Sequence, residues 1–254
     1  MEVANATVVR AEALAGCLFR LVVRPDVPLA SWKPGQFVRL GVPAEGADPK
    51  KEARAFSFAG AHGDAFEFFG VAVPDGKTSP KLAALKTGDR LWFENKVQGF
   101  FTLDEAPAGA TDVLMVGSGA GIAPFAAMVS QGATDGFERA ILVHQVRHPD
   151  HLSYGAAFAA WARAKPGRFW VPIVSAPPSR FVVRDGHAAL RGLIGDHLED
   201  VERISGAALA PGRTLALLCG NPAMIAEVRA RLELRGLALH KKRAPGQILT
   251  ERYW

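Results

Sequence analysis

The chain has 254 residues, of which 49% are hydrophobic and 22% are charged. That composition is ordinary for a globular protein, and the length allows one large domain or two modest ones, each with its own core. Lys and Arg outnumber Asp and Glu by 30 to 25, and the resulting charge of +5 favours acidic partners or phosphate-bearing ligands. The basic residues form no long run and no known nucleic-acid-binding motif, so we expect no nucleic-acid partner.

Metal centres, disulfides and membrane spans find no support in the sequence. Cys17 and Cys219 lie far apart, which argues against a disulfide framework and a fused iron–sulfur module. His144, His148 and His151 lack partners at zinc spacing, so we expect them on a surface loop and expect no metal. No stretch approaches ~18 uninterrupted apolar residues, and no signal peptide is evident. A cytoplasmic enzyme or binding protein with no membrane partner is therefore expected.

The first hundred residues predict the short strands of an antiparallel barrel. These strands are Cys17–Val23, Gln36–Val42, Arg54–Ala59, Ala65–Val73 and Arg90–Glu94. Between them, Ser79–Leu85 predicts a short helix with Ser79 as its cap and Pro80 at its first position. The following Leu103–Thr111 is rich in Pro, Ala, Gly and acidic residues, which predicts a linker.

After this linker, strands and helices alternate. The predicted strands are Val113–Val116, Ala140–Val146, Phe169–Val174 and Thr214–Leu218. The predicted helices are Pro124–Gln131, Tyr154–Ala164, about Gly192–Asp200, and Pro222–Arg235. Strict alternation predicts right-handed βαβ units and a parallel sheet, which binds ligands at the carboxyl ends of its strands. The expected fold class is an antiparallel barrel followed by an α/β domain.

Within the α/β half, Asp112–Phe125 (DVLMVGSGAGIAPF) combines a strand, a glycine turn and a helix start. Its glycines Gly117, Gly119 and Gly121 fall at G-x-G-x-G, which matches the G-x-G-x-x-G dinucleotide fingerprint only in part. Unblocked backbone N–H groups and the positive end of the helix would together hold a pyrophosphate. The alternative interpretation is an ordinary strand-to-helix turn with spare glycines.

On a predicted barrel strand, Arg54 and Phe56 share one face, while Ala55 and Ser57 share the other. A cation beside an aromatic ring and a hydroxyl could hold a diphosphate and a flat ring. On spacing alone, however, an Arg on a solvent face and a Phe in the barrel core is the favoured interpretation.

Two other segments invite a ligand. In Val73–Ser79 (VPDGKTS), a turn and a helix start would suit a phosphate, and an ordinary turn with a helix cap fits equally well. The chain ends in Tyr253 and Trp254, an aromatic pair that would allow stacking on a planar cofactor. A C-terminal Trp is more often a mobile tail.

Several motifs occur in the order in which bacterial ferredoxin–NADP(+) reductases carry them, and the chain resembles that family over nearly its whole length. The motifs are RAFS, VAVPDGKTSPKLAALKTGD, GFF, GSGAGIAPF, HQVRHPDHLSY, CGNPAM and the terminal TERYW. The PDGKTSPKLAALKTGD run and the final YW are specific to the bacterial branch, whereas the wider flavoprotein superfamily shares the glycine turn. The resemblance implies an FAD-binding barrel over residues 1–104. It also implies a Rossmann-like NADP(H)-binding domain over 105–254, with a tail that returns to the flavin.

The resemblance also implies roles for individual residues. Arg54 would hold the FAD diphosphate, Phe56 would stack on the flavin, and Ser57 would bond its redox-active edge. Trp254 would cover the flavin where the nicotinamide must land, so that Ser57 and Trp254 are the implied catalytic residues. The further implied contacts near FAD are Ala55, Phe69, Lys77, Thr78, Ser79 and Ala120. The implied NADP(H) contacts are Gly117, Gly119, Gly121, Arg147, Ser175, Gly220, Asn221 and Pro222, with Asn221–Met224 near the nicotinamide half.

Three departures from the family pattern concern the cofactors. Phe56 replaces a Tyr, and Ala120 replaces a frequent Thr, so each position loses a hydroxyl. At the 2′-phosphate site Arg147 matches the family, but Ser175 is followed by Ala176 where an Arg is typical. The arginines that could supply the missing charge are Arg180, Arg184 and Arg191.

The function that this resemblance implies is electron transfer between NADP(H) and a ferredoxin or flavodoxin through FAD, by a monomer. The flavin carries out the redox chemistry, which fits the lack of any nucleophile or metal-ligand motif. One alternative is an NADH-dependent flavin or oxygenase reductase built on the same two domains. Another is a non-catalytic, flavin-binding regulatory or adaptor protein.

Overall fold

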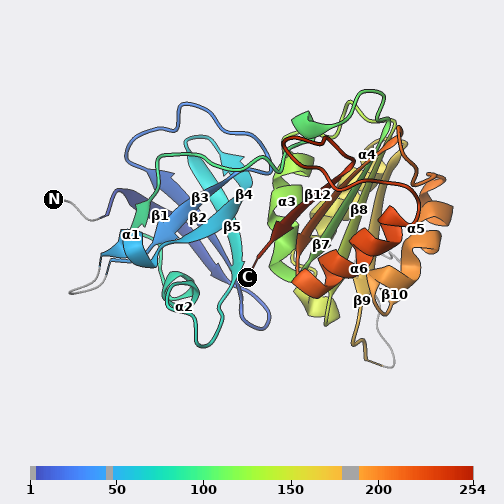
Figure 1. Ribbon diagram of the computed structural model, residues 1–254. Coiled ribbons are helices and arrows are strands. Elements are labelled where there is room, and N and C mark those ends of the chain that lie inside the picture. The colour runs from blue at the N-terminus through green and yellow to red at the C-terminus, as the bar shows by residue number, and fades with distance from the viewer. Residues whose placement is uncertain (1–3, 44–47, 179–188, 254) are drawn as a thin grey trace.

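The computed structural model describes residues 4–43, 48–178 and 189–253. In these residues a closed barrel is followed by a parallel sheet with helices on both faces, so the expected fold class is confirmed (Figure 1). The C-terminal strand of the sheet ends at the junction between the two parts. The predicted division into domains of residues 1–104 and 105–254 stays a prediction; its boundary falls within the short 3-10 helix η1 (Leu103–Glu105).

Antiparallel pairing closes the barrel in the order β1-β2-β5-β4-β3-β6. The strands are β1 (Ala6–Ala13), β2 (Leu18–Pro25), β3 (Phe37–Gly41), β4 (Arg54–His62), β5 (Ala65–Val71) and β6 (Arg90–Phe93). The sequence pattern missed β1, which pairs with both β2 and β6 and so completes the ring of strands. Phe58, Phe68 and Phe93 are fully buried in the barrel core, where their rings pack against one another.

Two short helices accompany the barrel, α1 (Pro49–Glu52) and α2 (Ser79–Ala83). The sequence analysis was wrong about the start of α2, because its N-cap residue is Thr78 and Ser79 is already helical. The Ser79 hydroxyl does not cap the helix; it accepts a hydrogen bond of 3.1 Å from the N–H of Val73. That bond closes the turn that leads into the helix.

The α/β part holds a parallel sheet in the order β10-β9-β8-β7-β11-β12. Its strands are β7 (Asp112–Ser118), β8 (Arg139–Val146), β9 (Arg168–Val174), β10 (Leu190–Arg191), β11 (Thr214–Gly220) and β12 (Ile248–Arg252). Its helices are α3 (Ala123–Ser130), α4 (Gly155–Ala164), α5 (Leu198–Ser205) and α6 (Pro222–Glu233), and its short 3-10 helices are η2 (Gly119–Ile122), η3 (Pro149–His151) and η5 (Ile194–His197). All residues of β7 and β11 are buried, as is expected of central strands covered on both faces.

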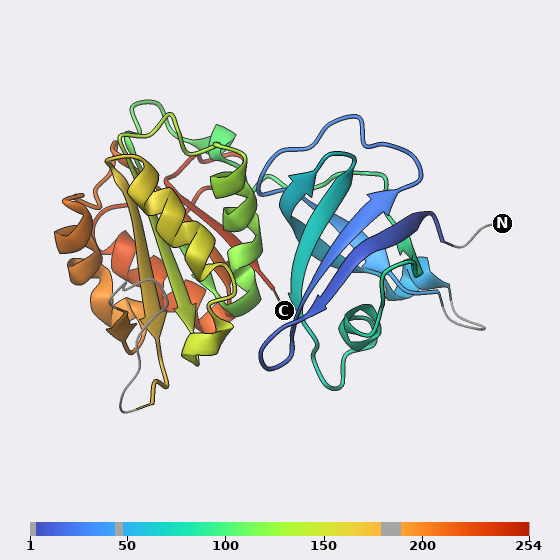
Figure 2. The ribbon, with the colours of Figure 1, turned by 180° about the vertical axis from the view of Figure 1, so that it is seen from behind.

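Helices cover the two faces of this sheet in pairs. α3 and α4 cover one face, and α5 and α6 cover the other (Figures 1 and 2). α3 also lies against the barrel, and the hydrophobic core on its side includes Ala59 and Phe69 from the barrel together with Phe125 and Met128 from the helix. A continuous core therefore joins the two parts of the molecule.

One expectation fails in the second half of the chain. His144 was expected on a surface loop, but it lies on β8, within the strand predicted over Ala140–Val146, and is fully buried because nearly all of β8 is covered by its neighbours in the fold. Its neighbours His148 and His151 do lie in the following loop and η3. The sequence pattern also missed β12 in the terminal segment, which pairs with β11 from Ala216 to Gly220.

Candidate functional site

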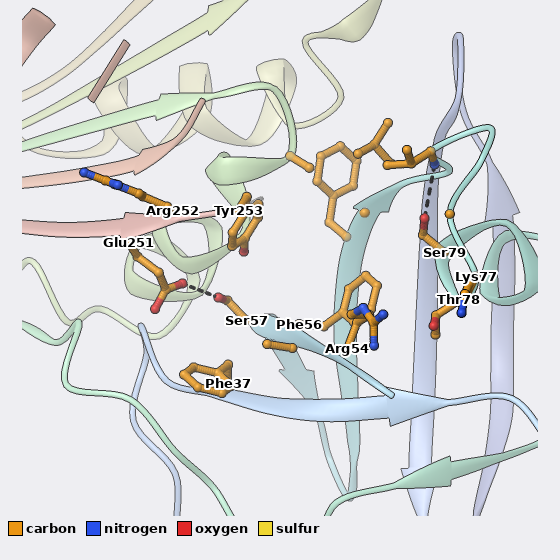
Figure 3. Close-up of a pocket in the computed structure, with 17 residues that line it drawn as sticks. Phe37, Arg54, Phe56, Ser57, Lys77, Thr78, Ser79, Glu251, Arg252 and Tyr253 are labelled. Carbon is orange, nitrogen blue, oxygen red and sulfur yellow. Dashed lines mark hydrogen bonds between the residues drawn. The ribbon is translucent and has the colours of Figure 1, made fainter. Parts of the chain in front are cut away.

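A cavity of about 560 Å³ lies where the barrel meets the sheet, a volume typical of small-molecule sites (Figure 3). Its walls come from β3, β4, β5, the turn before α2, the glycine turn and the end of β12. The lining residues are Phe37, Arg54, Ala55, Phe56, Ser57, Phe69, Gly70, Val71, Val73, Gly76, Lys77, Thr78, Ser79, Ala120, Glu251, Arg252 and Tyr253.

The first four residues of β4 form one wall of this cavity. Arg54 is exposed, and its guanidinium donates to the carbonyl oxygens of Glu52 (2.9 Å) and Ala53 (3.1 Å), which hold it at the rim. Phe56 lines the cavity and also packs into the barrel core, with its ring centroid 6.1 Å from that of Phe19. The interpretation with Phe56 in the barrel core and Arg54 exposed is therefore confirmed, and stacking of Phe56 on a flat ring stays a prediction. Ser57 is buried.

Across the cavity, the turn before α2 supplies the second wall (Figure 3). Thr78 is buried, and its hydroxyl donates to the carbonyl oxygen of Glu52, while the Ser79 hydroxyl holds the N–H of Val73. Both hydroxyls thus fix the turn. Lys77 is exposed and brings a positive charge to this end of the cavity.

Glu251, at the end of β12, is a residue that the sequence reasoning did not single out for a role. The Ser57 hydroxyl donates a hydrogen bond of 2.8 Å to its Oε1 atom (Figure 3). Burial raises the pKa of Glu251 to about 7, although this hydrogen bond lowers it in part. The pair joins the barrel to the sheet across 194 residues of sequence and can take up or release a proton near neutral pH.

Tyr253 follows β12 and also lines the cavity, where Figure 3 shows its ring close to the Ser57–Glu251 pair. Its N–H donates to the carbonyl oxygen of Gly220 at 3.3 Å, which ties the end of the chain to the turn after β11. Burial raises the pKa of Tyr253 well above its ordinary value, so its phenol stays neutral. Trp254, the implied cover of the flavin, lies outside the described residues.

Neither Glu251 nor Tyr253 could be recognised as a neighbour of Ser57 from the pattern of residues alone. The TERYW ending marked the segment, but only the parallel pairing of β12 with β11 turns Glu251 toward the barrel strand. Phe37, which begins β3 beside Ser57 in the barrel register, was missed in the same way.

The two turns that were expected to hold NADP(H) lie next to each other, because β7 and β11 are neighbouring parallel strands. A Cβ atom at Gly121 would lie 2.4 Å from the carbonyl oxygen of Cys219, so this glycine is required by the contact between the turns. The Ser118 hydroxyl accepts from the N–H of Asn221 at 2.8 Å. The Asn221 side chain in turn caps α6 by accepting from the N–H of Ala223 at 2.8 Å.

Buried His144 contacts the glycine turn that follows β7. Its Nε2 atom lies 3.4 Å from the carbonyl oxygen of Gly119, and burial lowers its pKa to about 4. The imidazole is therefore neutral at physiological pH, and the Nε2–H tautomer donates to that carbonyl.

The residues implied for the 2′-phosphate lie at the carboxyl edge of the sheet. Arg147 and Ser175 are exposed and follow β8 and β9, and the N–H of Ala176 donates to the carbonyl oxygen of Arg147 at 2.9 Å. Arg191 pairs with Val174 in the sheet, so its backbone lies beside the same edge. Arg180 and Arg184 lie outside the described residues.

The cavity therefore gathers the implied FAD residues of the described chain and none of the implied NADP(H) residues. Those that line it are Arg54, Ala55, Phe56, Ser57, Phe69, Lys77, Thr78, Ser79 and Ala120. Those that do not line it are Gly117, Gly119, Gly121, Arg147, Ser175, Gly220, Asn221 and Pro222. Over residues 4–43, 48–178 and 189–253, no group of three or more His, Cys, Asp or Glu side chains is arranged to hold a metal ion. Within the same residues, every helix is too short or too polar to cross a bilayer.

An aromatic face, cations at the rim and an acid–hydroxyl pair fit a flavin with a diphosphate. Phe56 and Tyr253 offer flat apolar surfaces, while Arg54 and Lys77 offer positive charge at the rim. At Gly70 a Cβ atom would lie 2.8 Å from the Phe56 ring, so the cavity floor requires a residue without a side chain. The donor set and shape of the cavity thus suit FAD.

Comparison with known proteins points the same way. Residues 115–230 match the model of the oxidoreductase NAD-binding domain. The chain is 32% identical over 243 residues to the flavodoxin/ferredoxin–NADP reductase of Escherichia coli (strain K12), covering 93% of each chain. It is 29% identical to the ferredoxin–NADP reductase of Pseudomonas aeruginosa, covering 89% of this chain and 88% of that one. Its fold matches that of a ferredoxin NADP+ reductase from Neisseria gonorrhoeae with bound FAD and NADP, with a TM-score of 0.86, 26% identity and 98% of each chain covered.

Proposed function

The chain belongs to the flavodoxin/ferredoxin–NADP reductase family, and we propose that it transfers electrons between NADP(H) and a ferredoxin or flavodoxin, with FAD held by the cavity at the junction. The observation that carries this proposal is the convergence of Arg54, Ser57, Lys77 and Glu251 on one cavity from separate segments of the chain. Neither part of the molecule contains the cavity alone. A flavin bound there would lie between the barrel and the sheet that holds the glycine turn.

Each wall of the cavity has a distinct task in this proposal. When bound, FAD supplies the chemistry of hydride and single-electron transfer. Arg54 and Lys77 bind the diphosphate, and Phe56 and Tyr253 hold the ring system by their flat faces. Glu251 holds or releases a proton at Oε1 behind Ser57. When Oε1 carries the proton it donates to the Ser57 oxygen, and the single Ser57 O–H is then free to donate toward the redox-active edge of the ring.

The nucleotide would bind along the carboxyl edge of the sheet. There the glycine turn of residues 117–121 offers backbone N–H groups for a pyrophosphate, supported by the buried His144. The turn after β11 lies beside it, and Arg147 lies further along the edge toward the adenosine end. Ala120 lines the flavin cavity from this side, so the nucleotide turn and the flavin cavity share a wall.

The protein partner would be an acidic carrier. The chain carries an excess of five positive charges, and exposed Arg54, Lys77 and Arg252 all line the cavity mouth. A positive rim at the point of electron exit would steer an acidic protein to the flavin. A ferredoxin or a flavodoxin of low isoelectric point meets this requirement.

The test of the proposed function is spectroscopic. The purified protein should be yellow, release FAD on denaturation, and lose its flavin absorbance when NADPH is added without oxygen. The reduced protein should then reduce a ferredoxin or flavodoxin, more slowly at high salt, while a neutral quinone acceptor should show little salt dependence. A colourless protein indifferent to NADPH would favour a binding module, and a flavin reduced only by NADH would favour an oxygenase-type reductase.

A further inference from the structure

The two parts of the molecule touch at a second place, away from the flavin cavity. The first contact is the packing of α3 against β4, where side chains from both parts share a hydrophobic core. The second is polar and centres on Tyr154, which precedes α4 and reaches the barrel strands β2 and β5. Together with the Ser57–Glu251 hydrogen bond at the flavin cavity, these contacts fix the angle between the barrel and the sheet.

A buried carboxylate organises the second contact. The Glu67 side chain on β5 is 8% exposed, and its Oε1 accepts a hydrogen bond of 2.7 Å from the Tyr154 hydroxyl. The same oxygen lies 3.4 Å from Nε of Arg20 on β2, and Oε2 lies 3.0 Å from Nε2 of His62 on β4. Arg20 and His62 belong to the barrel, as Glu67 does. The Tyr154 hydroxyl, by contrast, donates its hydrogen bond to Glu67 from the sheet part of the molecule.

The ring of Tyr154 extends the contact toward the flavin cavity. The Arg20 guanidinium lies 4.7 Å from the centre of the Tyr154 ring, a distance typical of a cation–π contact. On its other side, the ring meets Phe69 edge to face at 5.2 Å, and Phe69 lines the flavin cavity. A shift of Tyr154 would therefore be felt by a wall of the flavin site.

Between the two contacts the junction is not filled by side chains. A second cavity of about 360 Å³ lies there, with walls from β4, α3 and α4 and with Glu67 and Tyr154 at one side. Much of its wall consists of small residues such as Ala61, Ala126 and Ala157. Close packing cannot hold α4 against the barrel across an open space. The contacts beside this cavity are those of Tyr154 with Glu67, Arg20 and Phe69 and a 3.5 Å hydrogen bond from Arg20 to the carbonyl oxygen of Ser153. The Glu67–Tyr154 hydrogen bond is the shortest polar contact among them.

We propose that Tyr154 is a positioning residue: through its hydrogen bond to Glu67 it sets the angle between the sheet and the barrel, and so the distance between nicotinamide and flavin. The inference rests on the proposed function. Burial and the neighbouring Glu67 raise the pKa of Tyr154 well above its ordinary value, so the phenol remains a donor at all physiological pH values.

The variant Tyr154→Phe tests this, because it removes the hydroxyl and keeps the ring against Arg20 and Phe69. In anaerobic stopped-flow experiments on the FAD-loaded protein, we expect the limiting rate of flavin reduction by NADPH to fall about tenfold, the lower end of what a bond to a charged group supports. The apparent Kd of NADPH should change less than about twofold. The long-wavelength charge-transfer band, which reports stacking of nicotinamide on flavin, should weaken.

Glu67→Gln is the conservative partner variant, since an amide oxygen can still accept from the hydroxyl, and its reduction rate should lie between those of wild type and Tyr154→Phe. Asp26→Asn is the control, because it breaks the Arg90 ion pair on the barrel without touching the junction. A Tyr154→Phe protein that loses thermal stability but keeps the wild-type reduction rate and charge-transfer band would overturn the inference. So would a loss of NADPH affinity at an unchanged limiting rate. If Tyr154→Phe does not fold, Glu67→Gln decides by the same readouts, and a wild type that NADPH fails to reduce refutes the proposed function instead.

Discussion

The flavin cavity and the nucleotide edge of the sheet are built in different ways. The cavity opens at a charged rim, but its inner groups are buried and paired: Ser57 is hydrogen-bonded to Glu251, and Thr78 is hydrogen-bonded to the carbonyl of Glu52. At the nucleotide edge, Arg147 and Ser175 are exposed and follow the ends of their strands. One site has its groups fixed before any ligand arrives, and the other presents groups that a ligand must gather.

The difference has an energetic consequence. An interaction between buried groups, where the dielectric is low, is stronger than the same interaction in water, and the cost of a charge there is also larger. Substitutions in the cavity should therefore change measured free energies more than substitutions at the exposed edge. The predictions below test that order.

The largest effect is expected at Glu251, whose pKa is raised from 4.5 to about 7 by burial. A carboxyl with a raised pKa contributes stability that is complete below pH 4.5 and is lost as the pH rises through 7. At 1.36 kcal/mol per pKa unit, this amounts to on the order of 3 kcal/mol. Denaturant titrations of the flavin-free protein should show wild-type stability falling between pH 4.5 and 7 relative to Glu251→Gln, which keeps an oxygen for the Ser57 hydroxyl.

The control for this prediction is Glu94→Gln in the barrel. The Arg39 hydrogen bond lowers the pKa of Glu94, so the sign is reversed: its stabilising contribution is present above the ordinary carboxyl pKa and is lost as the solution becomes more acidic. Parallel stability curves for wild type and Glu251→Gln across neutral pH would show that Glu251 is not buried as a charge-sensitive group.

A smaller effect is expected at Arg54, on the exposed rim of the same cavity. A charge-assisted bond to a phosphate is worth roughly 1.5–3 kcal/mol, and exposure favours the lower half of that range. Arg54→Ala should therefore weaken FAD binding about thirtyfold, measured by quenching of flavin fluorescence on titration into the flavin-free protein. Arg39→Ala is a matched control, because Arg39 pairs with Glu94 outside the cavity lining. Equal losses in the two variants would remove Arg54 from the diphosphate site.

The fold was predictable where periodicity is strong and local. Buried β7 and β11 show as apolar runs, and the Pro after each turn marks a helix start. β12 was missed because pairing with distant β11, rather than its own pattern, makes it a strand. β1 was missed although it pairs mainly with β2, which follows it directly. Residue type misled at His144, because a lone histidine in a strand gives no sign of which face of the sheet it occupies.

The site was predictable where its residues form contiguous motifs, as along Arg54–Ser57 and Lys77–Ser79, all of which line the cavity. Only the family resemblance indicated a cofactor role for these motifs. Spacing alone favoured an ordinary barrel strand at Arg54–Ser57 and left an ordinary turn equally possible at Lys77–Ser79. The place of Glu251 in the site could not be predicted, because it depends on a hydrogen bond between residues 194 positions apart. Tyr154 was seen only as a helix start, because its partner Glu67 lies on a barrel strand.

The smallest effect is expected at Arg147, on the exposed nucleotide edge. A single exposed contact with a 2′-phosphate supports about a tenfold preference for NADPH over NADH. Arg147→Ala should raise the apparent KM for NADPH by about that factor and leave the KM for NADH nearly unchanged, because NADH lacks the phosphate. Steady-state kinetics with both nucleotides measure the two values, and Arg24→Ala, which removes an equal charge from the far barrel, should change neither.

Two opposite failures of this prediction carry different meanings. If Arg147→Ala weakens both nucleotides equally, the side chain contacts a part they share and does not distinguish them. If the wild type already prefers NADH, then Ala176 has removed the charge on which the family's NADPH preference depends. It would also follow that Arg191, whose backbone pairs with β9 at the same edge, does not supply a replacement charge. A preference for NADPH that far exceeds tenfold would instead require a second cation at this edge. The nucleotide site would then hold more of its groups in place before binding than the exposed ends of β8 and β9 indicate.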